Sequence, residues 1–500
     1  MSVGSSNLYI RTVEPKRSSG SPRPAGPAPA DPERIVVIVP RGEVVRNFVH
    51  SGALDTLAER AIVSLLSVSF DEETHRLLET KYGDIHPLTE HGERWLVRFE
   101  REILEAAHNR WVWSPASRSR VRLHDAAATT GRQKLIRTAK KSISRAFANR
   151  VAVEALSKIE RVSSRLLNTT DEYLRLFRQI RPSMVFNGSH VHSRVATQAV
   201  QAAQWLKIPT ATFIFSWDNL TSQGRIMLPY DYFLVWNDQL KDQLLQMYRQ
   251  IRPEQVFVTG TPQFDFHFRP EFYQSREKFC NEVGADPKRP IVFYTTGMAN
   301  HMPGEPELVE QIADVLCEVS CKEAPQLLVR VYPKDLTGRF EPLKKKRPDI
   351  LFQKTVWDEA WLTPRFKDSF GLTNALRHCA VGINIASTIS LELCMFDRPV
   401  INVGYNPPGV PLGDHRFIEF YDFDHYRPLV DGGAIDLARN PLQMREMIQN
   451  CLQDPAHRRA ERKALIDAMF GSTLDGRSAQ RVAKTIGMLA ERCGNAANNE

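Results

Sequence analysis

The stretch Val381–Tyr405, VGINIASTISLELCMFDRPVINVGY, is the part of the chain that best indicates the fold. It begins with an apolar segment, passes through Ser387 and Thr388 into a short helical pattern that carries Glu392, and ends in a second apolar segment. This pattern predicts a strand–helix–strand unit of a parallel sheet, with the helix beginning at the carboxyl end of a buried strand. The N–H groups and the helix dipole at that point favour an anion such as phosphate.

Ser387, Thr388 and Glu392 are the side chains that a nucleotide diphosphate would need there. Thr388 and Glu392 are four residues apart, so a helix places them on one face, a hydroxyl for phosphate and a carboxylate for the ribose diol. The alternative is that Ser387 or Thr388 only caps the helix and Glu392 is an ordinary first-turn acid. A capping box requires the acid three residues after the cap, and Glu392 has that spacing from neither.

The pattern Ser-Thr-x-x-x-Glu-x6-Pro resembles the donor-binding segment of GT-B glycosyltransferases and the related UDP-GlcNAc 2-epimerases. This resemblance implies pyrophosphate at Ser387 and Thr388 and ribose at Glu392, although the epimerases have Ser-Gly-Gly where this chain has Ser-Thr. Three further segments resemble bacterial surface-carbohydrate glycosyltransferases and CDP-glycerol glycerophosphotransferases: SWDNLTSQG (Ser216–Gly224), VTGTPQFD (Val258–Asp265) and DGRSAQRVAKTI (Asp475–Ile486). The resemblance covers roughly residues 35–490.

Strands that alternate with helices predict an α/β fold of the GT-B-like class, with two doubly wound, Rossmann-like parallel-sheet domains that face a cleft. Residues 1–34, rich in Ser, Pro and Gly, predict a disordered tail. Residues 35–268 are expected to bind the acceptor, and residues 269–474 to bind a nucleotide sugar. The last helix, within 475–500, is expected to pack back on the first domain. Residues 71–110 have a helical pattern.

The composition is that of an ordinary globular protein. The chain has 500 residues, of which 42% are hydrophobic and 25% charged, enough for two or three domains. It shows no signal-peptide pattern and no apolar run that could span a bilayer, and its seven scattered cysteines suit a reducing compartment. We therefore expect a cytoplasmic protein, with the inner face of the plasma membrane as a peripheral location.

Neither a metal nor a cofactor is expected. No GxGxxG follows a strand, which disfavours a dinucleotide oxidoreductase. The pairs Asp414-His415 and Asp424-His425 match the ligand spacing of no tetrahedral metal site. The small molecule predicted to bind is the nucleotide-sugar donor itself.

Three further donor-binding candidates follow predicted strands of the second domain. Arg330 and Lys334 end the strand in LLVRVYPKD, where parallel sheets place their ligand crevice, and both could reach a pyrophosphate. Lys334 could instead form a surface pair with Asp335, and a buried Arg330 would need a partner. Thr296, in Thr-Thr-Gly, has the composition of a phosphate loop, although Thr-Gly also makes ordinary turns.

Transfer to an acceptor hydroxyl needs a base at the cleft, and three residues after predicted strands are candidates: Glu43, His190 and Asp218. Each also has a structural interpretation, respectively as an acid before a helix, a cap and an Asx-turn residue. Acceptor contacts are expected from Arg41, Trp217 and Asn219. Because Trp217 follows its strand, we expect it to stack on a sugar rather than join the core.

The helical segment 110–180 contains the strongest local charge. Between Arg110 and Arg150 there are eleven Lys or Arg and one acid, whereas the whole chain has a net charge of +8. Within 131–151, Ile136, Ala139, Ile143 and Phe147 recur at helical spacing among lysines and arginines. Such a helix either lies on an anionic membrane or packs on the domain by its apolar face. Nucleic acid is not an expected partner, because aromatic side chains are sparse there.

The sequence therefore predicts a metal-independent glycosyltransferase that moves a sugar from a nucleotide-diphosphate donor to a cell-surface glycan or lipid-linked acceptor. Two alternatives remain open. One is a CDP-glycerol-type glycerophosphotransferase, and the other is a catalytically idle nucleotide-sugar-binding protein at the membrane.

Overall fold

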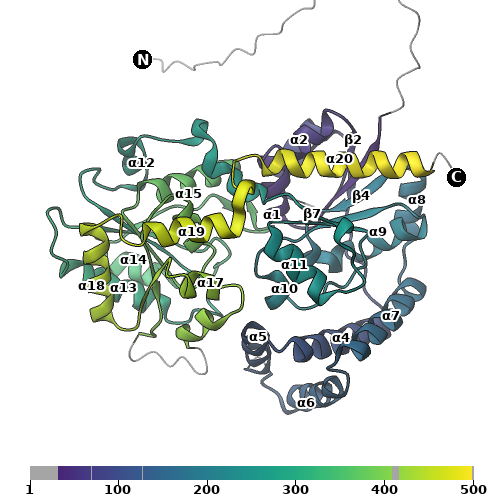
Figure 1. Cartoon of the computed structure of the whole chain (residues 1–500), viewed down its shortest axis with the longest axis horizontal. Helices are drawn as coiled ribbons and strands as arrows, with labels where there is room; N and C mark the ends of the chain where they lie inside the picture. The colour runs from purple at the N-terminus through teal and green to yellow at the C-terminus, as the bar shows by residue number, and fades with distance from the viewer. Residues whose placement is uncertain (1–31, 69, 127, 408–415, 498–500) are drawn as a thin grey trace, which may run out of the picture. The chain divides into compact units, whose positions relative to one another are not determined.

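A computed structural model describes residues 32–497, apart from 69, 127 and 408–415. Most of the predicted tail, 1–34, thus lies outside the described residues, as do Asp414 and His415. From Glu33 onward the chain forms one compact unit that contains two parallel sheets with helices on both faces of each (Figure 1).

The first sheet has seven parallel strands in the order β3-β2-β1-β4-β5-β6-β7. Its strands are β1 (Arg34–Val39), β2 (Ile62–Ser67), β3 (Ile85–Pro87), β4 (Met184–Asn187), β5 (Thr210–Phe213), β6 (Tyr232–Val235) and β7 (Val256–Val258). The continuous apolar run Ile35–Val39 forms the centre of the sheet, because β1 pairs with β2 on one side and β4 on the other. It is fully buried, as expected for a parallel strand covered by helices on both faces.

The second sheet has six parallel strands in the order β10-β9-β8-β13-β14-β15. Its strands are β8 (Ile291–Thr295), β9 (Gln326–Arg330), β10 (Leu351–Phe352), β13 (Val381–Asn384), β14 (Val400–Val403) and β15 (Asp436–Ala438). Both sheets reverse their strand order once, between β1 and β4 and between β8 and β13. Ligands of doubly wound sheets bind at such a reversal, beyond the carboxyl ends of the strands.

The helices of the first half are α1 (Gly42–Val44), the π-helix η1 (Val45–His50), α2 (Ala53–Ala58), α3 (Glu72–Tyr82), α4 (Trp95–Val112), α5 (Pro115–Ala126), α6 (Gly131–Ala146), α7 (Arg150–Leu167), α8 (Asp171–Ile180), α9 (Ser193–Trp205), α10 (Asn219–Ser222) and α11 (Asp238–Met247). Those of the second half are α12 (Arg276–Val283), α13 (Glu305–Cys317), α14 (Glu341–Lys346), α15 (Phe366–His378), α16 (Ile389–Met395), α17 (Arg427–Asp431), α18 (Pro441–Gln453), α19 (Arg459–Phe470) and α20 (Ser478–Ala497).

The two-domain, doubly wound prediction is confirmed, but the sequence misses several short strands. Residues 71–110 are not wholly helical, because β3 interrupts them as a three-residue edge strand that ends in Pro87. The antiparallel pair β11 (Trp357–Asp358) and β12 (Thr363–Pro364) is also missed. Strands this short carry too few residues to show a period in the sequence. The boundary at residue 268 and the roles given to each domain stay predictions.

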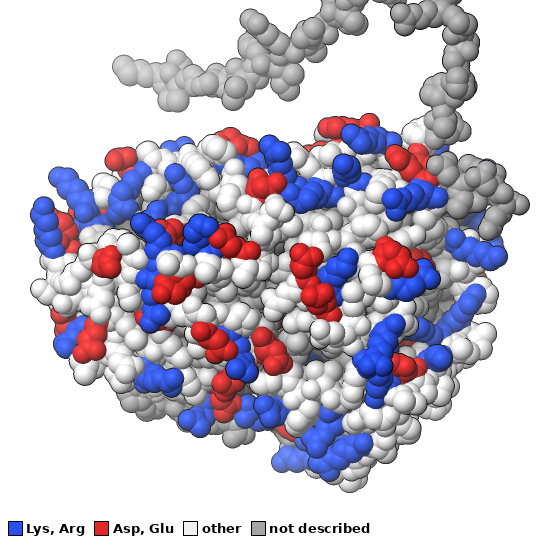
Figure 2. Space-filling model, in the orientation of Figure 1, with Lys and Arg blue, Asp and Glu red and all other residues white. Residues whose placement is uncertain are grey.

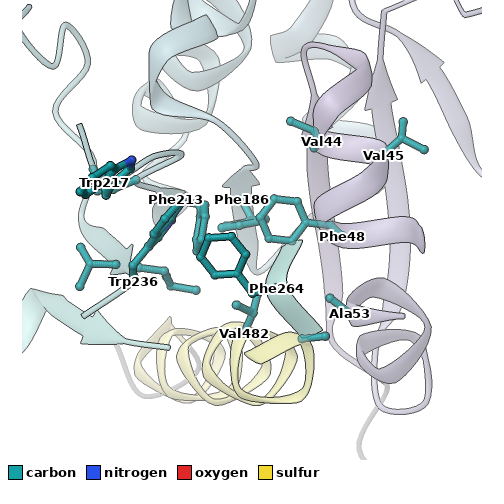
Figure 3. Packing of buried hydrophobic residues seen from close by; sticks show 14 of the residues in the cluster. Val44, Val45, Phe48, Ala53, Phe186, Phe213, Trp217, Trp236, Phe264 and Val482 are labelled. Atoms are coloured by element: carbon teal, nitrogen blue, oxygen red, sulfur yellow. The ribbon is translucent and has the colours of Figure 1, made fainter. Parts of the chain in front are cut away.

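Aromatic side chains fill the core of the first domain. Phe48 contacts Phe186 and Phe213 edge-on, with ring centroids 5.4 and 5.3 Å apart. The C-terminal helix α20 closes this core from one side, and Figure 3 shows its Val482 beneath Phe264. Since Val482 is fully buried, we expect it to contribute about 1.5–3 kcal/mol of stability. This last helix of the chain therefore packs on elements of its first half, including α2 and β4.

Helices α4 to α7 form a group of their own between β3 and β4 (Figure 1). Helix α4 is the centre of this group and contacts α5, α6 and α7. Helix α5 in turn contacts α10, which follows β5. Through α5, the group reaches the loops at the carboxyl ends of the first sheet.

Candidate functional site

A cavity of about 510 Å³ lies between the two sheet domains. Its walls come from loops that follow strands of both sheets and from α5. The cavity brings together five candidates from the sequence: Trp217, Asp218, Thr296, Ser387 and Thr388. This convergence, from segments up to 171 residues apart, makes the cavity the candidate site.

The second domain contributes the loops at its strand-order reversal. Thr296 directly follows β8, and Ser387 and Thr388 follow the neighbouring strand β13. The Thr296 hydroxyl accepts a hydrogen bond of 2.8 Å from the backbone N–H of Tyr332, which follows β9 and also lines the cavity. Three hydroxyl-bearing residues thus line the cavity where the fold places ligands.

In the turn from β13 into α16, two backbone N–H groups already donate hydrogen bonds to side chains of the same turn. The Ser387 N–H donates to the Asn384 side chain at 3.1 Å, and the Ile389 N–H donates to the Ser387 hydroxyl at 3.3 Å. Helix α16 is also short, with seven residues. A diphosphate held by the amides beside Ser387, as the sequence suggests, would have to replace these bonds. The side chains of Ser387 and Thr388 are the more accessible ligands.

A buried polar network beneath this turn fixes its shape. The Tyr426 hydroxyl lies 2.7 Å from both the Ser390 hydroxyl and the Asn402 side-chain oxygen. Asn384 accepts from Ser390 and from Asn402, each at 3.0 Å. Above the network, Ala386 is held at φ 41°, in the left-handed region that favours glycine. A buried network of this kind can hold a strained turn in one geometry.

Glu305 similarly supports the loop after β8. Its carboxylate is fully buried and accepts from the Gly297 N–H at 3.0 Å, the Tyr294 hydroxyl at 2.9 Å and Arg339 at 2.8 Å. Burial raises the pKa of Glu305 to about 7, although Arg339 and these hydrogen bonds act in the opposite direction. Because Gly297 lines the cavity, Glu305 is a positioning residue beneath the candidate phosphate loop.

The first domain contributes Trp217 and Asp218, which follow β5. Trp217 is 6% exposed, meets the His425 ring edge-on at 5.1 Å and belongs to the hydrophobic core. This corrects the expectation that Trp217 lies outside the core, although the residue does line the cavity. The Asp218 carboxylate accepts from the Ser222 hydroxyl at 2.5 Å and also lines the cavity.

Glu392 does not line this cavity, as far as the described residues show. Its carboxylate accepts a hydrogen bond of 2.7 Å from Nε2 of His267, which is itself 3% exposed. The Thr373 hydroxyl lies 3.1 Å from the other ring nitrogen of His267. Sequence reasoning missed this pair, because 125 residues separate its members. A ribose contact at Glu392 stays a prediction.

Glu43 and Lys334 form an ion pair between the two domains. Arg41 is a second partner, with its Nε 3.1 Å from the Glu43 carboxylate. Burial acts to raise the pKa of Glu43, but the charges of Lys334 and Arg41 outweigh it and hold the pKa below the usual value. None of the three residues lines the cavity. A carboxylate held by two cations is a poor base, so the geometry disfavours Glu43 in that role.

Three other candidates lie away from the cavity wall. Arg330 is buried and ion-paired with Asp368 at 2.6 Å, which satisfies its charge inside the second domain. His190 lines a smaller cavity of about 260 Å³, and burial lowers its pKa to about 4. Asn219 is buried and accepts from the Ser216 N–H at 2.8 Å. These contacts indicate structural roles for Arg330 and Asn219.

Sequence reasoning did not predict that α5 would form part of the cavity wall. Arg120 and His124 of this helix line the cavity, and Arg120 also pairs with Glu105 at 2.9 Å. A helical pattern alone does not show which loops of the fold a helix contacts. Among the described residues, no group of three or more His, Cys, Asp or Glu is arranged to hold a metal ion, and no helix is long and apolar enough to cross a membrane.

No protein-family model matches the chain, and no curated protein matches its sequence. Among solved structures, it is similar to a UDP-N-acetylglucosamine 2-epimerase from Listeria monocytogenes, described as putative, with a TM-score of 0.53, 12% identity, and coverage of 92% of this chain and 98% of that one. It is also similar to UDP-GlcNAc 2-epimerase from Neisseria meningitidis bound to UDP-GlcNAc (TM-score 0.50, 10% identity, 91% and 99% covered). A third is S. aureus MnaA with UDP (TM-score 0.50, 12% identity, 91% and 95% covered). The chain therefore has the GT-B-like fold, two Rossmann-like domains in tandem, that is seen in these structures.

Proposed function

We propose that the chain is a glycosyltransferase that moves a sugar from a nucleotide diphosphate to a hydroxyl of a cell-surface glycan or lipid-linked acceptor. The observation that carries the proposal is the cavity between the domains. It has hydroxyl-bearing residues of the second domain on one side and a carboxylate and an aromatic ring of the first domain on the other. The two sides suit a donor and an acceptor, respectively.

In this proposal, Asp218 is the base. The acceptor hydroxyl transfers its proton to the Asp218 carboxylate while its oxygen attacks the anomeric carbon of the donor. The bond from that carbon to the diphosphate oxygen breaks, and the nucleoside diphosphate leaves. Asp218 is the one of the three base candidates that lines the cavity among the described residues.

The leaving diphosphate gains negative charge, which hydrogen-bond donors and cations stabilise. Ser387 and Thr388 supply hydroxyls from the second domain, and Arg120 supplies a guanidinium from α5. Arg330 and Lys334 are not assigned this role, because neither lines the cavity, whereas Arg120 does. A metal-independent reaction is part of the proposal.

A donor screen tests the proposal. The purified chain is heated with UDP-, GDP- and dTDP-sugars and with CDP-glycerol, since a ligand at a hundredfold its Kd adds about 2.7 kcal/mol of stability. Any stabilising donor is then incubated with an extract of native lipids and glycans, and products are analysed by mass spectrometry. Sugar transfer from a nucleotide sugar supports the proposal. Transfer from CDP-glycerol alone would assign the chain to glycerophosphate transfer, and binding without turnover would make it a binding protein.

Epimerisation of a UDP-sugar is a second candidate. It is favoured by the fold likeness to UDP-GlcNAc 2-epimerases over nearly the whole described chain. Incubation with UDP-GlcNAc in the absence of any acceptor separates the two reactions. A new epimeric sugar under those conditions supports epimerisation, whereas turnover that depends on an added acceptor supports transfer.

A further inference from the structure

Helix α6 presents its apolar face to solvent rather than to the protein. Leu135 is 71% exposed, and the predicted stripe of Ile136, Ala139, Ile143 and Phe147 is exposed as well. Its basic side faces inward instead: Lys140 pairs with Glu102 of α4, and Arg137 and Lys141 pair with Asp125 of α5. Helix α6 therefore differs from an ordinary amphipathic helix, which packs on its protein by the apolar face.

Helix α7 also exposes apolar side chains while it buries polar ones. Its buried face carries Ser157, Glu160 and Ser164 beside the apolar Val153, and Arg101 of α4 donates to Glu160 at 2.5 Å and to Ser164 at 3.0 Å. Its outward face carries an apolar stripe at helical spacing, formed by Val151, Ala155, Ile159, Val162 and Leu166. Val151 is 77% exposed and Leu166 70%. A helix that buries an ion pair and exposes aliphatic side chains has a surface suited to an apolar environment.

The two stripes follow one another along the chain, and together we call their residues the α6–α7 face: Leu135, Ile136, Ala139, Ile143, Phe147, Val151, Ala155, Ile159, Val162 and Leu166. Phe147 ends the first stripe and Val151 begins the second, four residues later. Lys158 and Arg165 flank the second stripe, and the Arg165 guanidinium lies 3.9 Å from the ring of Trp205, which is half-exposed. Figure 2 shows lysines and arginines gathered over α6.

We propose that the α6–α7 face docks on an anionic lipid bilayer. Its aliphatic side chains would enter the boundary between headgroups and acyl chains, while the flanking cations contact the lipid phosphates. A tryptophan at its edge suits the interfacial region. The proposal goes beyond the transfer reaction and does not rest on it, because it concerns a surface outside the cavity.

Charge is the reason to choose a bilayer over a second copy of this chain. Among the described residues of α6 and α7, five exposed cations form no ion pair: Arg132, Lys134, Arg145, Lys158 and Arg165. Pairing two such faces would bring like charges together, which opposes association. Anionic lipid headgroups complement the same charges.

The proposed docking would also bring the candidate site close to the membrane. Helix α5 lies between the cavity and α6: His124 of α5 lines the cavity, and Asp125 beside it pairs with Lys141 of α6. If the proposed transferase uses a lipid-linked acceptor, the bound lipid phosphate would lie on the same side of the protein as α5.

Co-sedimentation with lipid vesicles tests the docking. The full chain is mixed with vesicles of phosphatidylcholine alone or with added phosphatidylglycerol, at salt from about 0.1 M to about 1 M. The test variant is Ile159→Asp/Leu166→Asp. The control is Leu336→Asp/Leu442→Asp, which changes two leucines of the second domain that are also more than half exposed. Circular dichroism and thermal melting show whether each variant is folded.

We expect the wild type and the control to bind vesicles that contain phosphatidylglycerol, and the α7 variant to bind at least about tenfold less. Binding should weaken as salt rises. Equal binding by both variants, or no binding by the folded wild type, would overturn the proposal. The proposal would also be overturned if the wild type bound no vesicles and formed a dimer that the α7 substitutions convert to a monomer. If the chain binds vesicles but transfers no sugar, the docking proposal is supported and the proposed transfer reaction is wrong.

Discussion

Trp217 of the first domain donates a hydrogen bond from its indole N–H to the Thr388 hydroxyl of the second domain, at 3.1 Å. The two residues are 171 positions apart and both line the candidate cavity. Because each follows a strand of its own sheet, the bond joins the loops of the two domains at the site. A ligand that binds the Thr388 hydroxyl would therefore affect the loops of both domains.

Replacement of Thr388 tests whether its hydroxyl contacts the diphosphate. Thr388→Val keeps the shape of the side chain but removes the hydroxyl, so we expect nucleoside diphosphates to bind about tenfold more weakly, a loss of about 1.4 kcal/mol. Isothermal calorimetry measures the affinity. Thr138→Val, on the exposed side of α6, serves as the control and should bind as the wild type does. Equal affinities for both variants would place the diphosphate elsewhere.

The identity of the base can be tested by comparing two carboxylates. Asp218→Asn should lower kcat by about 10²–10⁴-fold, because an amide cannot accept the proton of the acceptor. Glu43→Gln should leave kcat close to that of the wild type, since Glu43 is held by Lys334 and Arg41 away from the cavity. Steady-state rates with the donor identified by the screen give both values. A larger loss of kcat for Glu43→Gln than for Asp218→Asn would identify Glu43 as the base instead of Asp218.

The raised pKa of Glu305 predicts a specific pH dependence of folding stability. Its pKa is raised by burial from 4.5 to about 7, so between these pH values the folded chain keeps a proton that the unfolded chain has released. The free energy of unfolding should therefore fall as pH rises through this window, by up to about 3 kcal/mol. Glu305→Gln cannot titrate and should lack this contribution.

Urea unfolding of the wild type and of Glu305→Gln, at pH values from about 5 to about 8 in steps of about one unit, measures the difference. If the two curves keep a constant separation, Glu305 does not titrate in this range.

The pair formed by His267 and Glu392 should contribute to stability. His267→Ala leaves the nearly buried Glu392 carboxylate without this donor, which should cost about 1–3 kcal/mol. His267→Gln retains an N–H donor and should lose less. Urea unfolding ranks the three proteins, and an alanine variant as stable as the glutamine variant would show that the hydrogen bond contributes little.

Local pattern was sufficient to predict the parts of the fold and site that are contiguous in sequence. Strand β13 and the turn at Ser387 and Thr388 follow from one apolar run and its helical continuation. Long-range pairs could not be predicted in this way. Lys334 and Glu43 are 291 residues apart, and only the folded chain brings their charges together. A pair of this kind leaves no periodic signal in the sequence.

Helix α6 illustrates a second limit. Its sequence shows an apolar stripe beside a basic side, and the stripe alone predicts packing against the protein as readily as docking on a membrane. The carboxylates that decide its orientation, Glu102 and Asp125, belong to α4 and α5. The direction of an amphipathic face therefore depends on its neighbours.

The central claim is that a nucleoside diphosphate binds in the cavity between the domains, beside Ser387 and Thr388. A crystal of the protein soaked with a nucleotide-diphosphate sugar tests it most directly. We predict density for the diphosphate within hydrogen-bonding distance of the Ser387 and Thr388 hydroxyls, with the sugar directed toward Asp218. Density for the nucleotide outside this cavity, with the Ser387–Thr388 turn unchanged, would contradict the account.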